Sequence, residues 1–129
     1  MQAVKSSGSK IETSLAKALW VRGHRYRKND KRIFGKPDLT FKKIKIAIFV
    51  DGEFWHGKNW KVRKHDHKTN KKYWLNKIES NITRDKIVNR ALIKNGWEVL
   101  RFWGADIENK LETCIDKIEK IIDVRSEKI

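Results

Sequence analysis

The stretch that decides the fold is residues 44–56, Ile-Lys-Ile-Ala-Ile-Phe-Val-Asp-Gly-Glu-Phe-Trp-His. Its first part, residues 46–50, is almost continuously apolar and mostly β-branched or aromatic, which predicts a buried β-strand. Gly52 is the turn signal that ends this strand. An acid, two aromatic residues and a histidine follow, and such side chains are poorly suited to forming only a core. We therefore expect a strand that delivers functional side chains at its C-terminal end.

A second carboxylate, Asp38, precedes this strand in the sequence. Pro37 can begin a strand but cannot continue one in a sheet interior, because proline has no N–H, so Asp38 lies at or near a strand's start. Two short adjacent strands, 38–42 and 45–51, would bring Asp38 and Asp51 together at one end of a sheet. Mg²⁺ prefers carboxylate oxygens, waters and phosphate oxygens as ligands. The pair is a candidate metal site.

The rest of the chain predicts one α/β domain spanning residues 1–129. Residues 1–8 read as a flexible lead, and residues 56–72 as a long basic loop. Hydrophobic periodicity and turn signals predict the order α-β-β-β-α-β-α, with a helix from Ser9 to Gly23, strands at 24–27, 38–42 and 45–51, a helix at 73–94 stopped by Asn95-Gly96, a strand at 97–103 and a helix at 107–123.

Glu12 has two possible roles. Ser9-Lys10-Ile11-Glu12 matches a capping box, in which Glu12 occupies the third helical position and bonds back to the helix start. Alternatively, Glu12 is an acidic residue near the metal site. The sequence leaves both roles open.

The chain carries 31 Lys and Arg against 16 Asp and Glu, a net charge of +15. The excess is concentrated in residues 24–36 and 56–72, which flank the two strands that carry the carboxylates. A positive field of this kind favours an anionic polymer, nucleic acid first. In the second segment, the cations best placed for phosphates are Lys58, Lys61, Arg63 and Lys64. The alternative is a merely well-solvated basic surface.

Cysteine usage and hydropathy indicate the compartment. Cys114 is the only cysteine, so the chain has no internal disulfide framework and no cysteine-based zinc cluster. We expect Cys114 to pack inside the last helix and the protein to reside in a reducing cytosol. No N-terminal apolar region resembles a secretion signal, and no stretch approaches the ~20 apolar residues of a membrane span.

Three aromatic residues and one histidine surround the basic loop. His56 is suited by its pKa to proton transfer near neutral pH; alternatively it contacts a phosphate or has no role. Phe54 and Trp55 are adjacent, so on an extended segment they point to opposite sides and cannot easily both be buried. Together with Trp74 they could act as apolar wedges between DNA base steps; the alternative is that they belong to the core.

With these residues collected, the chain resembles the very-short-patch-repair (Vsr) endonucleases, which nick DNA at T:G mismatches. The resemblance spans nearly the whole chain in matching order. It rests on Ile11-Glu12, Gly35-Lys36-Pro37-Asp38, Phe49-Val50-Asp51-Gly52-Glu53-Phe54-Trp55-His56, Tyr73-Trp74-Leu75-Asn76-Lys77-Ile78, Asn81 with Arg84-Asp85, and Gly96-Trp97-Glu98-Val99-Leu100 with Trp103.

This resemblance implies a restriction-endonuclease-like, three-layer core of the PD-(D/E)xK type, with a mixed central sheet between helices. It implies that Asp38 is the principal Mg²⁺ ligand, that the backbone carbonyl of Val50 binds metal, and that His56 is catalytic. Glu12 matches a glutamate near the active site. The trio of Phe54, Trp55 and Trp74 matches aromatic residues that such enzymes intercalate beside the mismatch.

The chain departs from the family pattern in three places. Asp51 stands where better-known members have a catalytic histidine, and we expect it to be a second metal ligand, direct or through water. Glu53 replaces a zinc-ligand cysteine, and further cysteine and histidine ligands of the basic loop are absent, so we expect no structural zinc. The family's polar N-terminal arm is expected to be missing or shortened.

The sequence thus predicts an endonuclease that uses one or two Mg²⁺ ions to nick one strand of double-stranded DNA at a T:G mismatch. We expect a monomer in the prokaryotic cytoplasm, active on nucleoid DNA, with mismatch-repair proteins as possible partners. Two alternatives remain. One is a related nuclease that cuts specific or branched DNA without mismatch preference, and the other is a DNA-binding module with a decayed site.

Overall fold

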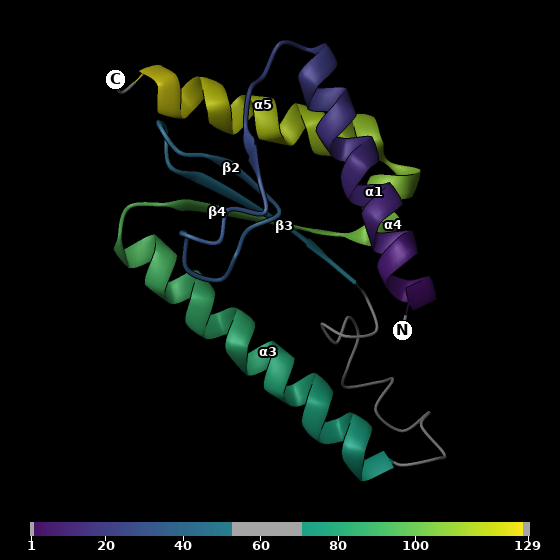
Figure 1. Cartoon of the computed structure of the whole chain (residues 1–129). Coiled ribbons are helices and arrows are strands. Elements are labelled where there is room, and N and C mark those ends of the chain that lie inside the picture. The colour runs from purple at the N-terminus through teal and green to yellow at the C-terminus, as the bar shows by residue number, and fades with distance from the viewer. Residues whose placement is uncertain (1, 53–70, 128–129) are drawn as a thin grey trace.

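A four-stranded mixed sheet with helices on both faces forms the fold, as the computed structural model shows for residues 2–52 and 71–127 (Figure 1). One face is covered by helices from both ends of the chain, and the other by a single long helix. Among the described residues the helices are α1 (Gln2–Val21), α3 (Lys71–Lys94), α4 (Gly104–Asn109) and α5 (Leu111–Glu127), and α3 is the one that covers the second face. The predicted three-layer α/β fold class is confirmed.

The strand order explains how the end of the sheet is built. The strands are β1 (Arg27–Lys28), β2 (Leu39–Phe41), β3 (Ile46–Asp51) and β4 (Glu98–Trp103), and they lie side by side in that order. The first two pairings are antiparallel, whereas β3 and β4 run parallel, with Asp51 opposite Trp103. The start of β2 and the ends of β3 and β4 therefore meet at one end of the sheet, which is called its edge below.

Alternation along β3 divides the core into two apolar clusters. Ile46 and Ile48 belong to the larger cluster, beneath α1 and α5, whereas Ala47 and Phe49 face α3. Both pairs are almost fully buried, as expected for a central strand covered on both sides. The larger cluster adds apolar residues from the helices, among them Leu15, Leu19, Ile107, Ile115 and Ile118.

Two glycines end the long helices as predicted. Gly23 has a φ of +92°, and the N–H of His24 donates to the carbonyl of Leu19 at 3.1 Å. Gly96, with a φ of +88°, ends α3 in the same way, through a 3.0 Å bond from the Trp97 N–H to the Leu92 carbonyl. Both ends are Schellman motifs, in which glycine adopts the left-handed conformation without a Cβ clash.

The first helix differs from the prediction. It begins at Gln2, not at Ser9, so the capping box is wrong and Glu12 lies inside the helix. Residues 2–5, Gln-Ala-Val-Lys, are compatible with a helix, and the internal Gly8 costs only about 1 kcal/mol relative to alanine.

Two further boundaries also differ. The strand predicted at 24–27 is replaced by the two residues of β1, so it is shorter and begins later than predicted. Tyr26, just before it, donates from its hydroxyl to the Ala16 carbonyl at 2.7 Å. The helix predicted at 107–123 is two helices, α4 and α5, separated by Lys110, whose φ of −136° and ψ of 47° are not helical. Cys114 is buried in α5, as expected.

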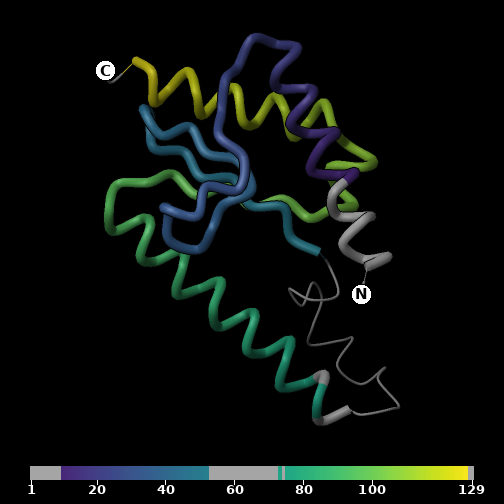
Figure 2. Tube along the Cα trace, viewed as in Figure 1, coloured from purple at the N-terminus to yellow at the C-terminus, as the bar shows by residue number. Residues whose placement is uncertain are grey.

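Figure 2 shows the C-terminal end of α5 near the turns that precede β3 and β4. Arg125, near the end of α5, donates from Nε to the Ile44 carbonyl at 3.0 Å and from Nη2 to the Gly96 carbonyl at 2.5 Å. It thus joins the turn before β3 to the turn before β4. Within the described residues, no helix is long and apolar enough to cross a membrane.

Candidate active site

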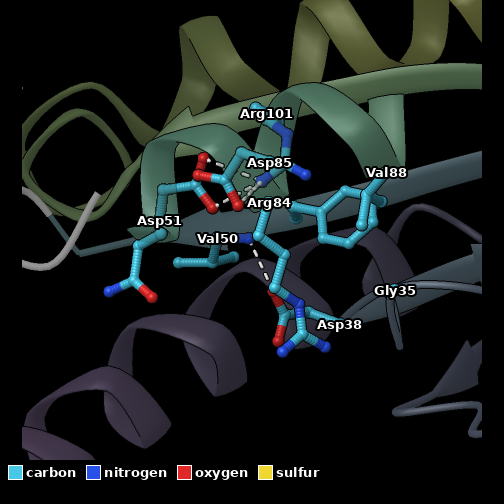
Figure 3. Close-up of a pocket in the computed structure, with 10 residues that line it drawn as sticks. Gly35, Asp38, Val50, Asp51, Arg84, Asp85, Val88 and Arg101 are labelled. Atoms are coloured by element: carbon cyan, nitrogen blue, oxygen red, sulfur yellow. Dashed lines mark hydrogen bonds and ion pairs between the residues drawn. The ribbon is translucent and has the colours of Figure 1, made fainter. Parts of the chain in front are cut away.

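A pocket of about 290 Å³ lies where β2 begins and β3 ends (Figure 3). Asp38 and Asp51 both line it, so the structure places the two predicted carboxylates in one pocket. Residues of α3 and β4 complete the wall. The lining residues are Gly35, Asp38, Phe49, Val50, Asp51, Asn81, Arg84, Asp85, Val88 and Arg101.

Asp38 is fixed by the backbone of both neighbouring segments. Its N–H donates to the Ile48 carbonyl at 2.9 Å, and its own carbonyl accepts from the Asn29 N–H at 3.0 Å. One carboxylate oxygen, Oδ2, accepts from the Val50 N–H at 2.6 Å (Figure 3). These three bonds hold the carboxylate in a defined orientation at the sheet edge without using any other side chain.

Glu12 reaches the same carboxylate from α1. Burial, the negative charge of Asp38 and a hydrogen bond with the Asp38 side chain raise the pKa of Glu12 from 4.5 to about 7, while Lys28 opposes the shift. Two carboxylates this close repel each other when both are ionised, so a shared proton or a cation stabilises the pair. Of the two roles open for Glu12, its position in the fold favours the one beside Asp38.

Asp51 has a different environment, on the α3 face of the sheet. Both of its carboxylate oxygens accept from Nη1 of Arg101, at 3.0 and 3.2 Å. The same Nη1 lies 3.5 Å from Asp85 in α3, so the guanidinium bridges two carboxylates (Figure 3). The side chains of Asp51 and Arg101 are only 8% and 18% exposed, which makes this a largely buried ion pair.

Arg101 is the residue that the sequence reasoning missed. It donates from Nε to Asn89 at 2.7 Å, and its guanidinium carbon lies 4.1 Å from the centre of the Phe49 ring. The available signal was a cation flanked on both sides by apolar residues in the predicted strand. The structure adds the parallel register, which sets Arg101 directly opposite Phe49 and two residues before Trp103, the partner of Asp51. This register brings Arg101 close to Asp51.

Several predicted site residues lie outside the described part of the chain. These are Phe54, Trp55, His56, Lys58, Lys61, Arg63 and Lys64. Glu53, which stands where the family pattern has a zinc-ligand cysteine, also lies outside it. Trp74 lies in the first turns of α3, and its backbone alone is described. The roles of these residues stay predictions.

The residues present fit a single divalent cation. Glu12 and Asp38 supply two carboxylates whose mutual repulsion a cation would relieve, and one or two carboxylates with waters and substrate phosphates are the usual Mg²⁺ set. Within residues 2–52 and 71–127, no group of three or more His, Cys, Asp or Glu side chains could hold a metal ion.

Comparison with known proteins gives consistent matches. The family model described as DNA mismatch endonuclease Vsr matches residues 1–62. The Type II nicking enzyme V.HpaIIP of Haemophilus parainfluenzae is 58% identical over 92% of this chain and 84% of its own length. V.NmeDIP of Neisseria meningitidis serogroup C, another Type II nicking enzyme, is 52% identical over 95% of this chain and 82% of its own length.

A more distant match is the DNA mismatch endonuclease Vsr of Escherichia coli K12, 33% identical over 85% of this chain and 70% of its own length. The family model covers β2, β3 and both carboxylates of the pocket, whereas the relatives extend over most of the chain. The fold, the site and these similarities agree, and the chain belongs to the Vsr endonuclease family.

Proposed function

We propose that the protein is a Mg²⁺-dependent DNA endonuclease that nicks one strand at a T:G mismatch. Membership of the Vsr family supports hydrolysis of DNA, and the names of its relatives include both nicking enzymes and a mismatch endonuclease. The observation that carries the proposal is the Glu12–Asp38 carboxylate pair at the edge of a basic protein's sheet.

In this proposal Asp38 and Glu12 hold the cation, with the Val50 carbonyl as a further ligand. When bound, Mg²⁺ neutralises charge on the phosphate and lowers the pKa of a bound water. The Val50 N–H keeps Asp38 oriented throughout. His56 transfers a proton near the leaving oxygen, and Asp51 contributes a further carboxylate, directly or through water.

DNA contacts come from the basic segment after β3. Lys58, Lys61, Arg63 and Lys64 neutralise backbone phosphates, while Phe54, Trp55 and Trp74 enter the base stack beside the mismatch. Unstacking costs roughly a few kcal/mol per step and is least at a weakened base pair, which would make the wedge selective for mismatches.

The test compares strand-specific cleavage of labelled T:G and T:A duplexes with Mg²⁺ and with EDTA. Asp38→Ala should abolish nicking, whereas Asp123→Ala, at an exposed position of α5, should leave the rate unchanged. Nicking of the T:G strand that needs Mg²⁺ and Asp38 supports the proposal. An Asp38→Ala protein that nicks at the wild-type rate would contradict it.

A second candidate is a nuclease without mismatch preference, acting on specific or branched DNA. The Asp51–Arg101 ion pair favours it, because a paired carboxylate stands where better-known family members carry a catalytic histidine. Equal cleavage of T:G, T:A and branched substrates would select this candidate. Salt-sensitive binding without cleavage in any divalent metal would instead leave a DNA-binding module.

We also propose that the protein acts as a monomer on nucleoid DNA in the prokaryotic cytoplasm, with mismatch-repair proteins as partners. Its high positive charge supports contact with DNA. Light scattering of the free protein and of its DNA complex would test the stoichiometry, and a dimer in both states would contradict it.

A further inference from the structure

Phe34 presents an aromatic ring to solvent although its neighbours in the chain are anchored. It lies in the β1–β2 loop, residues 29–38, and is 55% exposed. The preceding residue, Ile33, packs against the small apolar cluster under α3. A single exposed apolar side chain is ordinary on a protein surface, so what distinguishes Phe34 is the ordered, basic loop next to the pocket that carries it.

The β1–β2 loop is held in place by its own bonds. The Asp30 side chain, almost fully buried, accepts from the backbone N–H of Arg32 at 3.0 Å and from its Nε at 3.1 Å. The N–H of Lys36 donates to the Ile33 carbonyl at 3.0 Å. The ring of Phe34 is therefore carried on an ordered turn.

Gly35 fixes how closely this loop approaches α3. Its φ is +85°, and a Cβ at this position would collide with the Val88 side chain. Any other residue would strain the backbone and push the loop away from the helix. Gly35, Val88 and Asp38 all line the pocket (Figure 3). The tight packing thus holds Gly35 in the pocket wall, and Phe34 is its neighbour in the chain, four residues before Asp38.

The charge around the ring identifies its partner. Lys28, Lys31, Arg32 and Lys36 are exposed, and Asp30, the one acid among residues 28–36, is paired with Arg32. A protein partner for an apolar ring would not require this excess of cations. A duplex offers both phosphates for the lysines and an apolar groove wall for the ring.

We propose that the β1–β2 loop is a second DNA contact, in which Phe34 enters a groove next to the bond cleaved at Asp38. Lys31 and Lys36 contact phosphates on either side of it. The inference rests on the proposed function, because Asp38 marks the cleaved bond. It adds a contact outside the wedge residues and the basic segment after β3.

The test measures duplex binding in EDTA, where no cleavage occurs, by fluorescence anisotropy. Phe34→Ala should raise Kd by about tenfold, within the range seen when an aromatic that contacts a base is truncated. The matched control is Ile93→Ala, which removes a 61% exposed apolar side chain near the end of α3 and should leave Kd unchanged. Lys31→Ala and Lys36→Ala should each reduce the salt slope by about one.

Hydroxyl-radical footprinting of the same complexes locates the contact. Wild type should protect sugars next to the nick site, and Phe34→Ala should lose that protection while its thermal midpoint stays unchanged. Wild-type affinity and an unchanged footprint for Phe34→Ala would overturn the inference and leave the proposed nuclease intact. Failure of wild type to bind DNA would overturn both, and a monomer–dimer shift caused only by Phe34→Ala would assign the ring to self-association instead.

Discussion

The two faces of the sheet differ in how apolar and charged side chains are distributed over them. On the α1 and α5 face, apolar side chains pack continuously, and the charged groups lie at its margins, where Glu12 meets Asp38 and where Arg22 and His24 meet Glu119. On the α3 face the apolar cluster is smaller. There Arg101 of β4 forms ion pairs with Asp51 of β3 and Asp85 of α3. The first face therefore supplies most of the hydrophobic stabilisation, whereas the second holds charges close to the pocket.

The largest expected change in stability comes from the apolar face. Ile115 is fully buried, so Ile115→Ala should lower the free energy of unfolding by about 2–5 kcal/mol through lost burial and a residual cavity. Val124→Ala, at a 46% exposed position on the same helix, is the control. Urea titration measures both, and equal losses would mean that this face does not dominate stability.

The ion pair on the other face should respond differently. Arg101→Met leaves Asp51 and Asp85 without their shared cation and should cost about 3 kcal/mol, the low end for buried pairs because Arg101 is 18% exposed. Adding Asp51→Asn should recover part of that loss, since a neutral amide needs no counter-charge.

Denaturation of the two single variants and the double variant gives the coupling between Arg101 and Asp51. Cleavage sharpens the comparison further. If Asp51 acts in catalysis, the double variant should regain stability but not activity. Additive losses in stability would show that the pair is not a unit.

The carboxylate pair at the edge of the apolar face should make stability depend on pH. Because the pKa of Glu12 is raised from 4.5 to about 7, the unfolded chain releases this proton first, and metal-free stability should fall as pH rises through that interval. Glu12→Gln should flatten the fall, and Mg²⁺ should oppose it in wild type only. Thermal midpoints at several pH values, with EDTA and with Mg²⁺, measure this; a Glu12→Gln profile identical to wild type would contradict it.

The smallest effect is expected where α1 ends against α5. Hydrogen bonds from His24 and Arg22 lower the pKa of Glu119, so its contribution is present at neutral pH and is lost as pH falls through the folded-state value. Glu119→Gln should shift the acid unfolding midpoint slightly, because the site is partly exposed. Glu108→Gln, at an exposed position of α4, is the control, and equal shifts for the two variants would remove the assignment.

The sequence predicted the parts of the fold that depend on local signals. The apolar run at residues 46–50 and the helix-ending Gly23 and Gly96 were recognisable because burial and left-handed backbone leave clear patterns. The start of α1 was not, since Ser9-Glu12 satisfies a capping pattern that helical residues before it override. Lys110, which separates α4 from α5, carries no breaker signal at all.

The candidate site shows the same division. The approach of Asp38 and Asp51 followed from two short strands and one turn. Arg101 could not be assigned in advance, because its partners come from β3 and α3 and meet only through the parallel register of β4. A contact between strands that follow one another in the sequence could be predicted. A contact that depends on the crossover from β3 through α3 to β4 could not.

Arg125 also bears on how the molecule can be handled in experiments. Its guanidinium bonds to the turns before β3 and β4, where β3 starts. The pocket lies where β3 ends, about 20 Å away for a six-residue strand. A fluorophore or surface tether attached at Glu127, the last residue of α5, would therefore sit on the side away from the pocket. Single-molecule assays could immobilise the protein there. A truncation that removed Arg125 would break the bonds that join the turn before β3 to the turn before β4.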